Sequence, residues 1–189
     1  MDGDTADRLH RFSVEDYHRM GEAGILHEDS RVELIRGQVI DMTPIGTPHL
    51  AMVNRLNSLL AIALHGRATV SPQNPVRLPD GSEPQPDVTI LKWRADYYRR
   101  RRPEAQDVLL LIEVSDSSLD YDRNVKVPLY AEGGIPESWI VNLEEWCIEV
   151  YGALPDSHDA ARRIATAGDV LDVAGVAFQV AELLGDPAD

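Results

Sequence analysis

Two strongly apolar runs with strand character lie in the middle of the chain. They are PQPDVTIL, which ends at Leu91, and DVLLLIEVS, which ends at Ser115. Each run carries one carboxylate, Asp87 at the start of the first and Glu113 near the end of the second. An ionised carboxylate is costly to bury alone, because the protein interior does not replace its hydration unless a cation or hydrogen-bond donors do so. The pattern therefore indicates that a cation lies near these two acids.

The N-terminal part of the chain predicts a helix followed by a hairpin. Ser13 and Asp16 have the spacing of a capping box, which predicts a helix over 14–23. The sequence DSRVELIRGQVIDM, residues 29–42, predicts two short strands joined by a turn at its Arg-Gly pair. Glu33 lies inside the first of these strands, where a carboxylate either faces solvent or belongs to a site.

A longer amphipathic helix is predicted next. Thr47 and Pro48 form a helix start, with the hydroxyl capping a free amide and the proline pre-set at the first helical position. Apolar residues then recur at helical spacing until a stop near Gly66: Leu50, Val53, Leu56, Leu60 and Leu64. His49 lies in the first turn, where free amides favour anions, so it is a candidate to face a phosphate or a metal-bound water. The alternative is an ordinary surface histidine.

The remaining pattern completes a sheet and adds one late crossover helix, which ends at a Gly-Gly pair. The predicted strands are 68–71, 75–78, 137–142 and 146–151, the predicted helix is 121–132, and a weakly alternating tail covers 162–173. Helices that flank a run of strands predict an α/β or α+β fold, with a mixed central β-sheet covered by helices on both faces. The length fits one domain, residues 12–189, after an N-terminal tail of residues 1–11.

Composition narrows the class of protein. Hydrophobic residues make up 43% of the chain, which is typical of a globular protein rather than a disordered one. No apolar run approaches the roughly 20 residues that cross a bilayer, and the N-terminus lacks the features of a signal peptide, so we expect a cytoplasmic protein without a membrane partner. The single cysteine, Cys147, excludes an internal disulfide and a cysteine-cluster zinc site, and its alternating surroundings predict a small buried or edge thiol.

The charge is strongly acidic overall but unevenly distributed. A formal net charge of -14 weighs against tight nonspecific binding of nucleic acid. Six basic residues nevertheless gather in one short segment, interleaved with Trp93, Tyr97 and Tyr98: Lys92, Arg94, Arg99, Arg100, Arg101 and Arg102. This segment predicts a nucleic-acid-binding surface, and its alternative is a solvated arginine-rich loop.

The candidate chemistry is that of a divalent cation acting on phosphate. If the two acidic strands are neighbours, Asp87 and Glu113 can converge on Mg²⁺ or Mn²⁺, which prefers a few carboxylate oxygens completed by water. Lys126, carried by the predicted crossover helix, is either a solvated helix lysine or the group that holds the attacking water and neutralises phosphate charge. Glu33 could add a further contact.

Five segments of the chain resemble the PD-(D/E)xK nuclease superfamily and, more closely, the bacterial restriction endonucleases of the Uma type. They run in the order of that family between Phe12 and Tyr151: RVELIRGQVIDM, the helix that begins TPHL, PQPDVTIL, LLIEVSDSSLDYDRNVK and PLYAEGGIPESWIVN. The resemblance implies a restriction-endonuclease-like core of mixed sheet flanked by helices. It further implies that Asp87, Glu113 and the backbone carbonyl of Val114 are metal ligands.

The same resemblance assigns two more positions and contains one departure. Glu33 resembles the additional N-terminal acid of the family, and His49 stands where the family often has a histidine. The superfamily pattern places a lysine two residues after the second acid, but that residue here is Ser115. We therefore assign the role of the lysine to Lys126. Asn142, an aspartate in many relatives, is expected to be peripheral.

Three functions are open at this point. The first is a Mg²⁺-dependent DNA endonuclease whose catalytic residues Glu33, Asp87, Glu113 and Lys126 share one cleft, with the basic segment on its rim. The second is a non-catalytic protein-interaction or regulatory domain that keeps the nuclease-like fold, which the acidity and the lack of a DNA-reading module favour. The third is nucleic-acid binding without cleavage. We also expect a homodimer that pairs through an edge of the strand pair 137–151.

Overall fold

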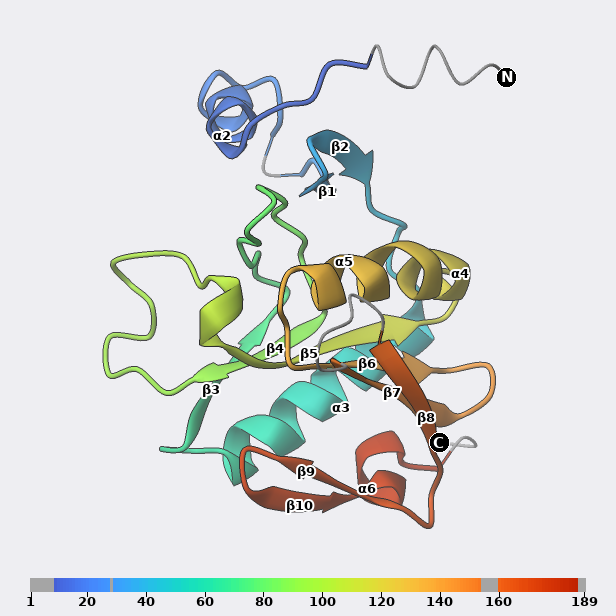
Figure 1. The fold of residues 1–189 in the computed structure, drawn as a ribbon. Helices are drawn as coiled ribbons and strands as arrows, with labels where there is room; N and C mark the ends of the chain where they lie inside the picture. Colours follow the sequence, from blue (N-terminus) through green and yellow to red (C-terminus); the bar gives the residue numbers. More distant parts are fainter. Residues whose placement is uncertain (1–8, 28, 154–159, 187–189) are drawn as a thin grey trace.

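A six-stranded mixed sheet forms the centre of the molecule (Figure 1). The computed structural model describes residues 9–27, 29–153 and 160–186. The strands follow in the spatial order β3 (Ala68–Pro72), β4 (Val88–Lys92), β5 (Val108–Ser115), β6 (Glu137–Asn142), β7 (Cys147–Ala153) and β8 (Ala160–Ala165). All neighbours are antiparallel except β5 and β6, which are parallel. The predicted mixed sheet with flanking helices is confirmed.

The parallel pair requires a crossover connection, because a tight turn joins only antiparallel strands. The crossover consists of α4 (Leu119–Tyr121), a π-helical turn (Asp122–Lys126) and α5 (Val127–Glu132). It ends at Gly134, whose φ of 77° is the left-handed conformation that glycine adopts without strain. The predicted crossover helix is therefore present, with a π turn in it that the sequence pattern did not predict.

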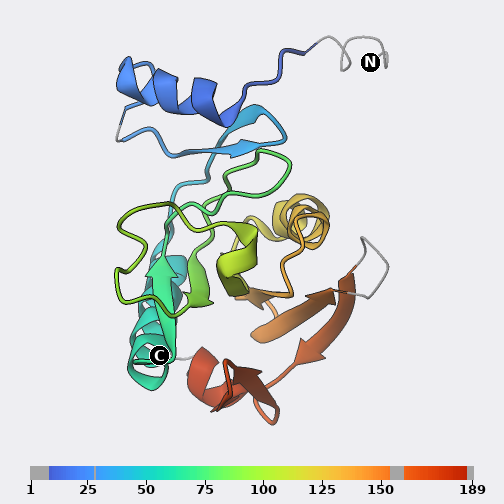
Figure 2. The same ribbon diagram turned by 60° about the vertical axis from the view of Figure 1, so that its left-hand side comes forward.

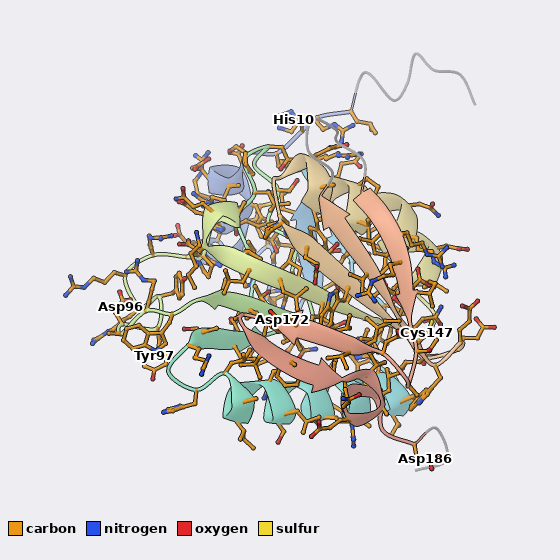
Figure 3. The ribbon with its side chains drawn as sticks, turned by 60° about the horizontal axis from the view of Figure 1, so that its bottom comes forward. His10, Asp96, Tyr97, Cys147, Asp172 and Asp186 are labelled. Atoms are coloured by element: carbon orange, nitrogen blue, oxygen red, sulfur yellow. The ribbon has the colours of Figure 1, made fainter. Side chains whose placement is uncertain are left out.

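Both faces of the sheet are covered. The long helix α3 (Thr47–Ala63) lies on one face together with β9 (Val170–Val173), β10 (Val176–Gln179) and α6 (Val180–Leu184), as Figure 3 shows. The crossover lies on the other face (Figure 1). Alternate residues of β5 point to the two faces, so Leu110 and Ile112 enter the core under α3, while Leu111 packs with Leu129 and Tyr130 of α5.

The N-terminal segment forms a separate small layer at one end of the molecule (Figure 2). It contains α2 (Val14–Glu22), with the predicted capping box, and the predicted hairpin of β1 (Val32–Ile35) and β2 (Gln38–Asp41). The hairpin turns at Arg36 and Gly37, both with positive φ, as a two-residue type I′ turn requires. Gly37 is also packed closely, since a Cβ there would lie 2.8 Å from the Cβ of Arg11.

Two local expectations about α3 are wrong. Gly46, not Thr47, is the N-cap, and no side chain caps the helix, so Thr47 is the first helical residue. Leu50 is 49% exposed, because the buried stripe is centred on Leu56 and Leu60 and Leu50 lies at its margin. The helix itself and its apolar face are confirmed.

The predicted strand at 75–78 is also wrong. The segment has one isolated bridge, between Arg77 and Glu104. Its amides instead bond to nearby carbonyls, Val76 to Pro84 and Leu78 to Ser82, at 3.0 and 2.9 Å. The segment therefore folds back on its own turn, although Val76 and Leu78 are buried.

The expected dimerisation edge is not an edge. β6 is paired on both sides, and β7 lies between β6 and β8. The weakly alternating tail supplies β8, which covers β7. In the described part of the chain the outer strands of the sheet are β3 and β8. Cys147 is buried, as predicted. No helix in the described ranges combines the length and the apolar character needed to cross a membrane.

Candidate active site

The register of β4 and β5 brings two acids to one point. Val88 pairs with Ile112, so the next position along places Asp87 opposite Glu113 on the same face of the sheet. β4 starts at Val88, so the amide of Val114 has no backbone partner there and donates to Oδ2 of Asp87 at 2.9 Å. Both carboxylates are buried, Asp87 to 8% exposure and Glu113 to 4%.

His49 lies against Asp87 rather than on the open surface. Its Nε2 is 2.9 Å from Oδ2 of Asp87, and its side chain is 15% exposed. The first turn of α3 places His49 there, beside the N-terminal end of β4. Its Nδ1 is buried without a hydrogen-bond partner among the described residues.

Lys126 is buried between two carboxylates and is not a solvated helix lysine. Its Nζ lies 3.3 Å from Oε2 of Glu33 and 3.2 Å from Oε1 of Glu113. Burial by itself lowers the pKa of Lys126, but the negative charges of Glu113 and Glu33 outweigh it and raise the pKa above its ordinary value. The ammonium group is therefore charged, and it is held by acids from two distant segments.

The π turn explains how the crossover presents this lysine. Tyr121 and Lys126 are five residues apart. Residues at this spacing lie on different faces of an α-helix but on the same face of a π turn. The hydroxyl of Tyr121 donates to Oε1 of Glu33 at 3.4 Å, beside the contact of Lys126 with the same carboxylate. One turn further, the hydroxyl of Tyr130 donates to Oε1 of Glu113.

Glu33 comes from the N-terminal hairpin and is 2% exposed, so it does not face solvent. The amide of Gln85 donates to its Oε2 at 3.1 Å. The backbones of Leu34 and Glu83 exchange two hydrogen bonds next to this contact, which fixes β1 beside the segment that leads to Asp87.

The site has more negative than positive charge. Burial raises the pKa of Glu113 to about 8, with Lys126 opposing the shift. Burial also raises the pKa of Asp122, although Lys126 and the hydroxyls of Ser118 and Ser115 favour its ionised form. Lys126 thus lies among four acids, Glu33, Asp87, Glu113 and Asp122, and burial is the main cause of the two raised carboxyl pKa values.

A pocket of about 440 Å³ opens beside these residues, and its wall includes Glu33, His49, Asp87, Glu113, Asp122 and Lys126. The four acids and the lysine thus meet from four segments of the chain. Sequence reasoning missed Tyr121, Asp122, Tyr130 and Gln85. The four-residue spacing of Asp122, Lys126 and Tyr130 on one helix was an available signal.

Ser115 lies two residues after Glu113, on the same face of β5. Its hydroxyl donates to Oδ2 of Asp122 at 2.7 Å, so this position contacts the crossover that carries Lys126.

The basic segment is not on the rim of this pocket. None of its residues lines the pocket, because the segment follows the far end of β4. Asp87 directly precedes β4 and Lys92 is its last residue, so the two residues lie roughly 17 Å apart at the rise of a β-strand. Figure 1 shows the loop after β4 and the π turn beside α4 at opposite sides of the sheet.

The sequence profile of the Uma2 family, described as "Putative restriction endonuclease", matches residues 14–181. The chain belongs to the Uma2 family. Among solved structures, this Uma2 chain is similar to a "putative nuclease belonging to DUF820" from Anabaena variabilis, with 13% sequence identity and a TM-score of 0.70. The match covers 92% of this chain and 97% of that one, and it shows a shared fold. No curated protein matches the chain.

Proposed function

We propose that the protein is a metal-dependent nuclease that hydrolyses phosphodiester bonds of DNA, with Glu33, Asp87, Glu113 and Lys126 as its catalytic residues. The observation that carries the proposal is the burial of Lys126 between Glu33 and Glu113 at the point where Asp87 stands opposite Glu113. Such a concentration of carboxylates destabilises a protein unless positive charge joins it, and it serves no purpose in a scaffold. Membership of the Uma2 family supports the same reaction.

The donor set fits Mg²⁺ or Mn²⁺. Within the described residues no three His, Cys, Asp or Glu side chains form a ready metal cluster. Mg²⁺ needs no such cage, because one or two carboxylates completed by water and substrate phosphate hold it. Asp87 and Glu113 would supply the carboxylates. The carbonyl of Val114 would add a ligand, since the N–H and C=O of a strand residue face the same side and the N–H already points to Asp87.

A bound divalent ion supplies polarisation of a phosphoryl oxygen and lowers the pKa of a water molecule. The chain's own residues do the rest. Lys126 keeps a fixed positive charge at the pocket wall, where it orients the attacking water and stabilises charge on the phosphate. Glu33, which accepts a hydrogen bond from Tyr121, holds Lys126 in place, and His49 fixes the orientation of Asp87.

The test is a calorimetric titration of Mn²⁺ into the wild-type protein and Asp87→Ala. We expect one site in the wild type and none in the variant. Glu22→Ala is the control, since Glu22 is an exposed carboxylate of α2 that does not line the pocket. Cleavage of plasmid DNA with Mg²⁺ then separates a nuclease from the non-catalytic alternative. Equal Mn²⁺ binding by wild type and Asp87→Ala would overturn the metal site.

We also propose a homodimer, because two-fold symmetric dimers are the commonest soluble oligomers. Since β6 and β7 are interior strands, the outer strand β8 replaces them as the pairing edge.

A further inference from the structure

The segment 92–103, named here the basic loop, divides its cations into two groups. Arg94, Arg101 and Arg102 each have a carboxylate partner, which for Arg102 is Glu83 at 3.9 Å. Arg94 bonds to Asp96 at 2.9 and 3.0 Å, and Arg101 bonds to Asp107 at 2.7 Å. Both guanidinium groups also lie by the ring of Tyr98, at 5.1 and 5.7 Å from its centroid. Arg94 and Arg101 therefore stabilise the conformation of the loop.

The second group is free to bind a ligand. Lys92, Arg99 and Arg100 are exposed and have no carboxylate partner among the described residues. Two aromatic side chains stand beside them, Trp93 at 49% exposure and Tyr97 at 70%. In a chain of net charge -14, this is a local concentration of unneutralised positive charge next to exposed flat rings.

The backbone of the loop holds Tyr97 outward. Tyr97 and Tyr98 both have positive φ, 49° and 61°, a conformation that bulky residues rarely adopt. Tyr98 stabilises this backbone conformation, because its side chain is buried and its hydroxyl donates a hydrogen bond to the carbonyl of Lys92 at 2.8 Å. An exposed ring on a strained but anchored backbone is a feature that folding alone does not require.

A hollow of about 490 Å³ lies between this loop and the outer strand β3. Its wall joins Tyr97, Arg99 and Arg100 to Thr69, Ser71 and Asn74. Positive charge, an aromatic face and short polar side chains thus border one surface.

We propose that the basic loop and this hollow bind single-stranded nucleic acid, with Arg99 and Arg100 on phosphates and Tyr97 and Trp93 stacked on bases. Exposed rings stack on the faces of unpaired bases, which a duplex keeps covered. The choice of nucleic acid as ligand rests on the proposed function. Lys92, the first residue of the loop, lies roughly 17 Å along β4 from Asp87, the span of about five stacked nucleotides at 3.4 Å each, so one strand can reach both sites.

The experiment measures fluorescence anisotropy of a labelled mixed-sequence oligonucleotide, single-stranded or as its duplex, in EDTA at several salt concentrations. We expect tighter binding of the single strand. Replacing Arg99→Ala and Arg100→Ala together should weaken binding at least tenfold and lower the slope of log K against log salt by about 1.4. Tyr97→Ala should lose about tenfold with an unchanged slope, and Tyr97→Phe should bind like the wild type.

The matched control is Arg19→Ala with Arg163→Ala, two exposed arginines elsewhere whose loss changes the net charge equally. An equal loss of affinity in the control, equal binding of duplex and single strand, or no binding by the wild type at low salt would each overturn the proposal. Asp87→Ala should bind the oligonucleotide normally in EDTA. A failed Mn²⁺ titration with intact oligonucleotide binding would therefore remove the nuclease assignment and leave the loop as a binding site.

Discussion

At the scale of single residues, Lys126 determines the electrostatics of the site. It is one of two lysines in the chain and the only one that is buried. Its two carboxylate partners lie in β1 and β5, so its charge compensates acids from segments that are far apart in sequence. Removing one partner of a buried ion pair leaves the other uncompensated, which costs more than the pair itself contributes.

We therefore expect Lys126→Met to lower the free energy of unfolding by about 3 to 5 kcal/mol at a pH above the raised pKa of Glu113, which is about 8. The side chain keeps its length, so the loss reports the missing charge rather than a cavity. Urea unfolding followed by circular dichroism measures it. Lys92→Met, at the exposed lysine, should change stability by less than about 0.5 kcal/mol. A neutral effect of Lys126→Met would show that Glu33 and Glu113 are already uncharged.

At the scale of elements, a second buried acid ties the crossover to the sheet. Glu149 of β7 is 0% exposed, and Arg123 of the π turn and Arg162 of β8 both bond to it, at 3.0 and 3.1 Å. Tyr151 and Asn142 donate to it at 2.6 and 3.1 Å. This cluster joins four elements, namely β6, β7, β8 and the π turn that also carries Lys126. It also gives Asn142 a structural role outside the pocket wall, as expected for a peripheral position.

The stability supplied by Glu149 should depend on pH. Burial opposes ionisation of Glu149, but hydrogen bonds from Arg123, Tyr151 and Asn142 outweigh it and lower its pKa from 4.5 to about 2. A folded-state pKa below the unfolded value stabilises the protein above pH 4.5, and this contribution is lost as the pH falls towards 2. Glu149→Gln should cost about 3 kcal/mol at pH 7 and progressively less below pH 4.5.

Chemical unfolding of wild type and Glu149→Gln at several pH values provides the measurement. Glu144→Gln serves as control, because Glu144 is exposed in the turn between β6 and β7. A cost of Glu149→Gln that stays constant down to pH 2 would contradict the assigned ionisation.

At the scale of the whole molecule, the acidic pocket and the basic loop lie apart, and so do the two outer strands of the sheet. The acidic pocket lies at one end of β4 and the basic loop at the other, on a chain of net charge -14. The sheet ends in β3 beside the basic loop and in β8 at the opposite side. In the described ranges β8 pairs only with β7, and its Ile164 is 42% exposed.

If β8 is the dimer edge, the protein should elute in size-exclusion chromatography at twice its 21.0 kDa mass. Ile164→Lys should yield the monomer, because a lysine on an outer strand opposes pairing with a second copy. Light scattering on the eluted peak gives the mass. The matched change at another exposed apolar strand residue, Val170→Lys in β9, should leave the dimer intact. A wild-type monomer at micromolar concentration would contradict the homodimer.

The sequence by itself determined most elements of this protein and the placement of its key acids on them. Alternation, helical spacing, the capping box and the Arg-Gly turn act between near neighbours, so they predicted α2, the β1 and β2 hairpin, α3, β4, β5 and the crossover. The carboxylates of Asp87 and Glu113 within apolar runs already indicated a site that requires positive charge. The predicted strand at 75–78 failed because its amides found partners in a nearby turn.

Only the tertiary structure decided which distant residues meet. The meeting of Glu33 and Lys126 depends on where the hairpin docks and on a π turn, and neither leaves a periodic signal in the sequence. Strand order decided that β8 covers β7 and that the basic loop lies away from the pocket. The local sequence pattern determines the secondary structure of each segment, whereas register and packing between segments determine which groups each side chain contacts.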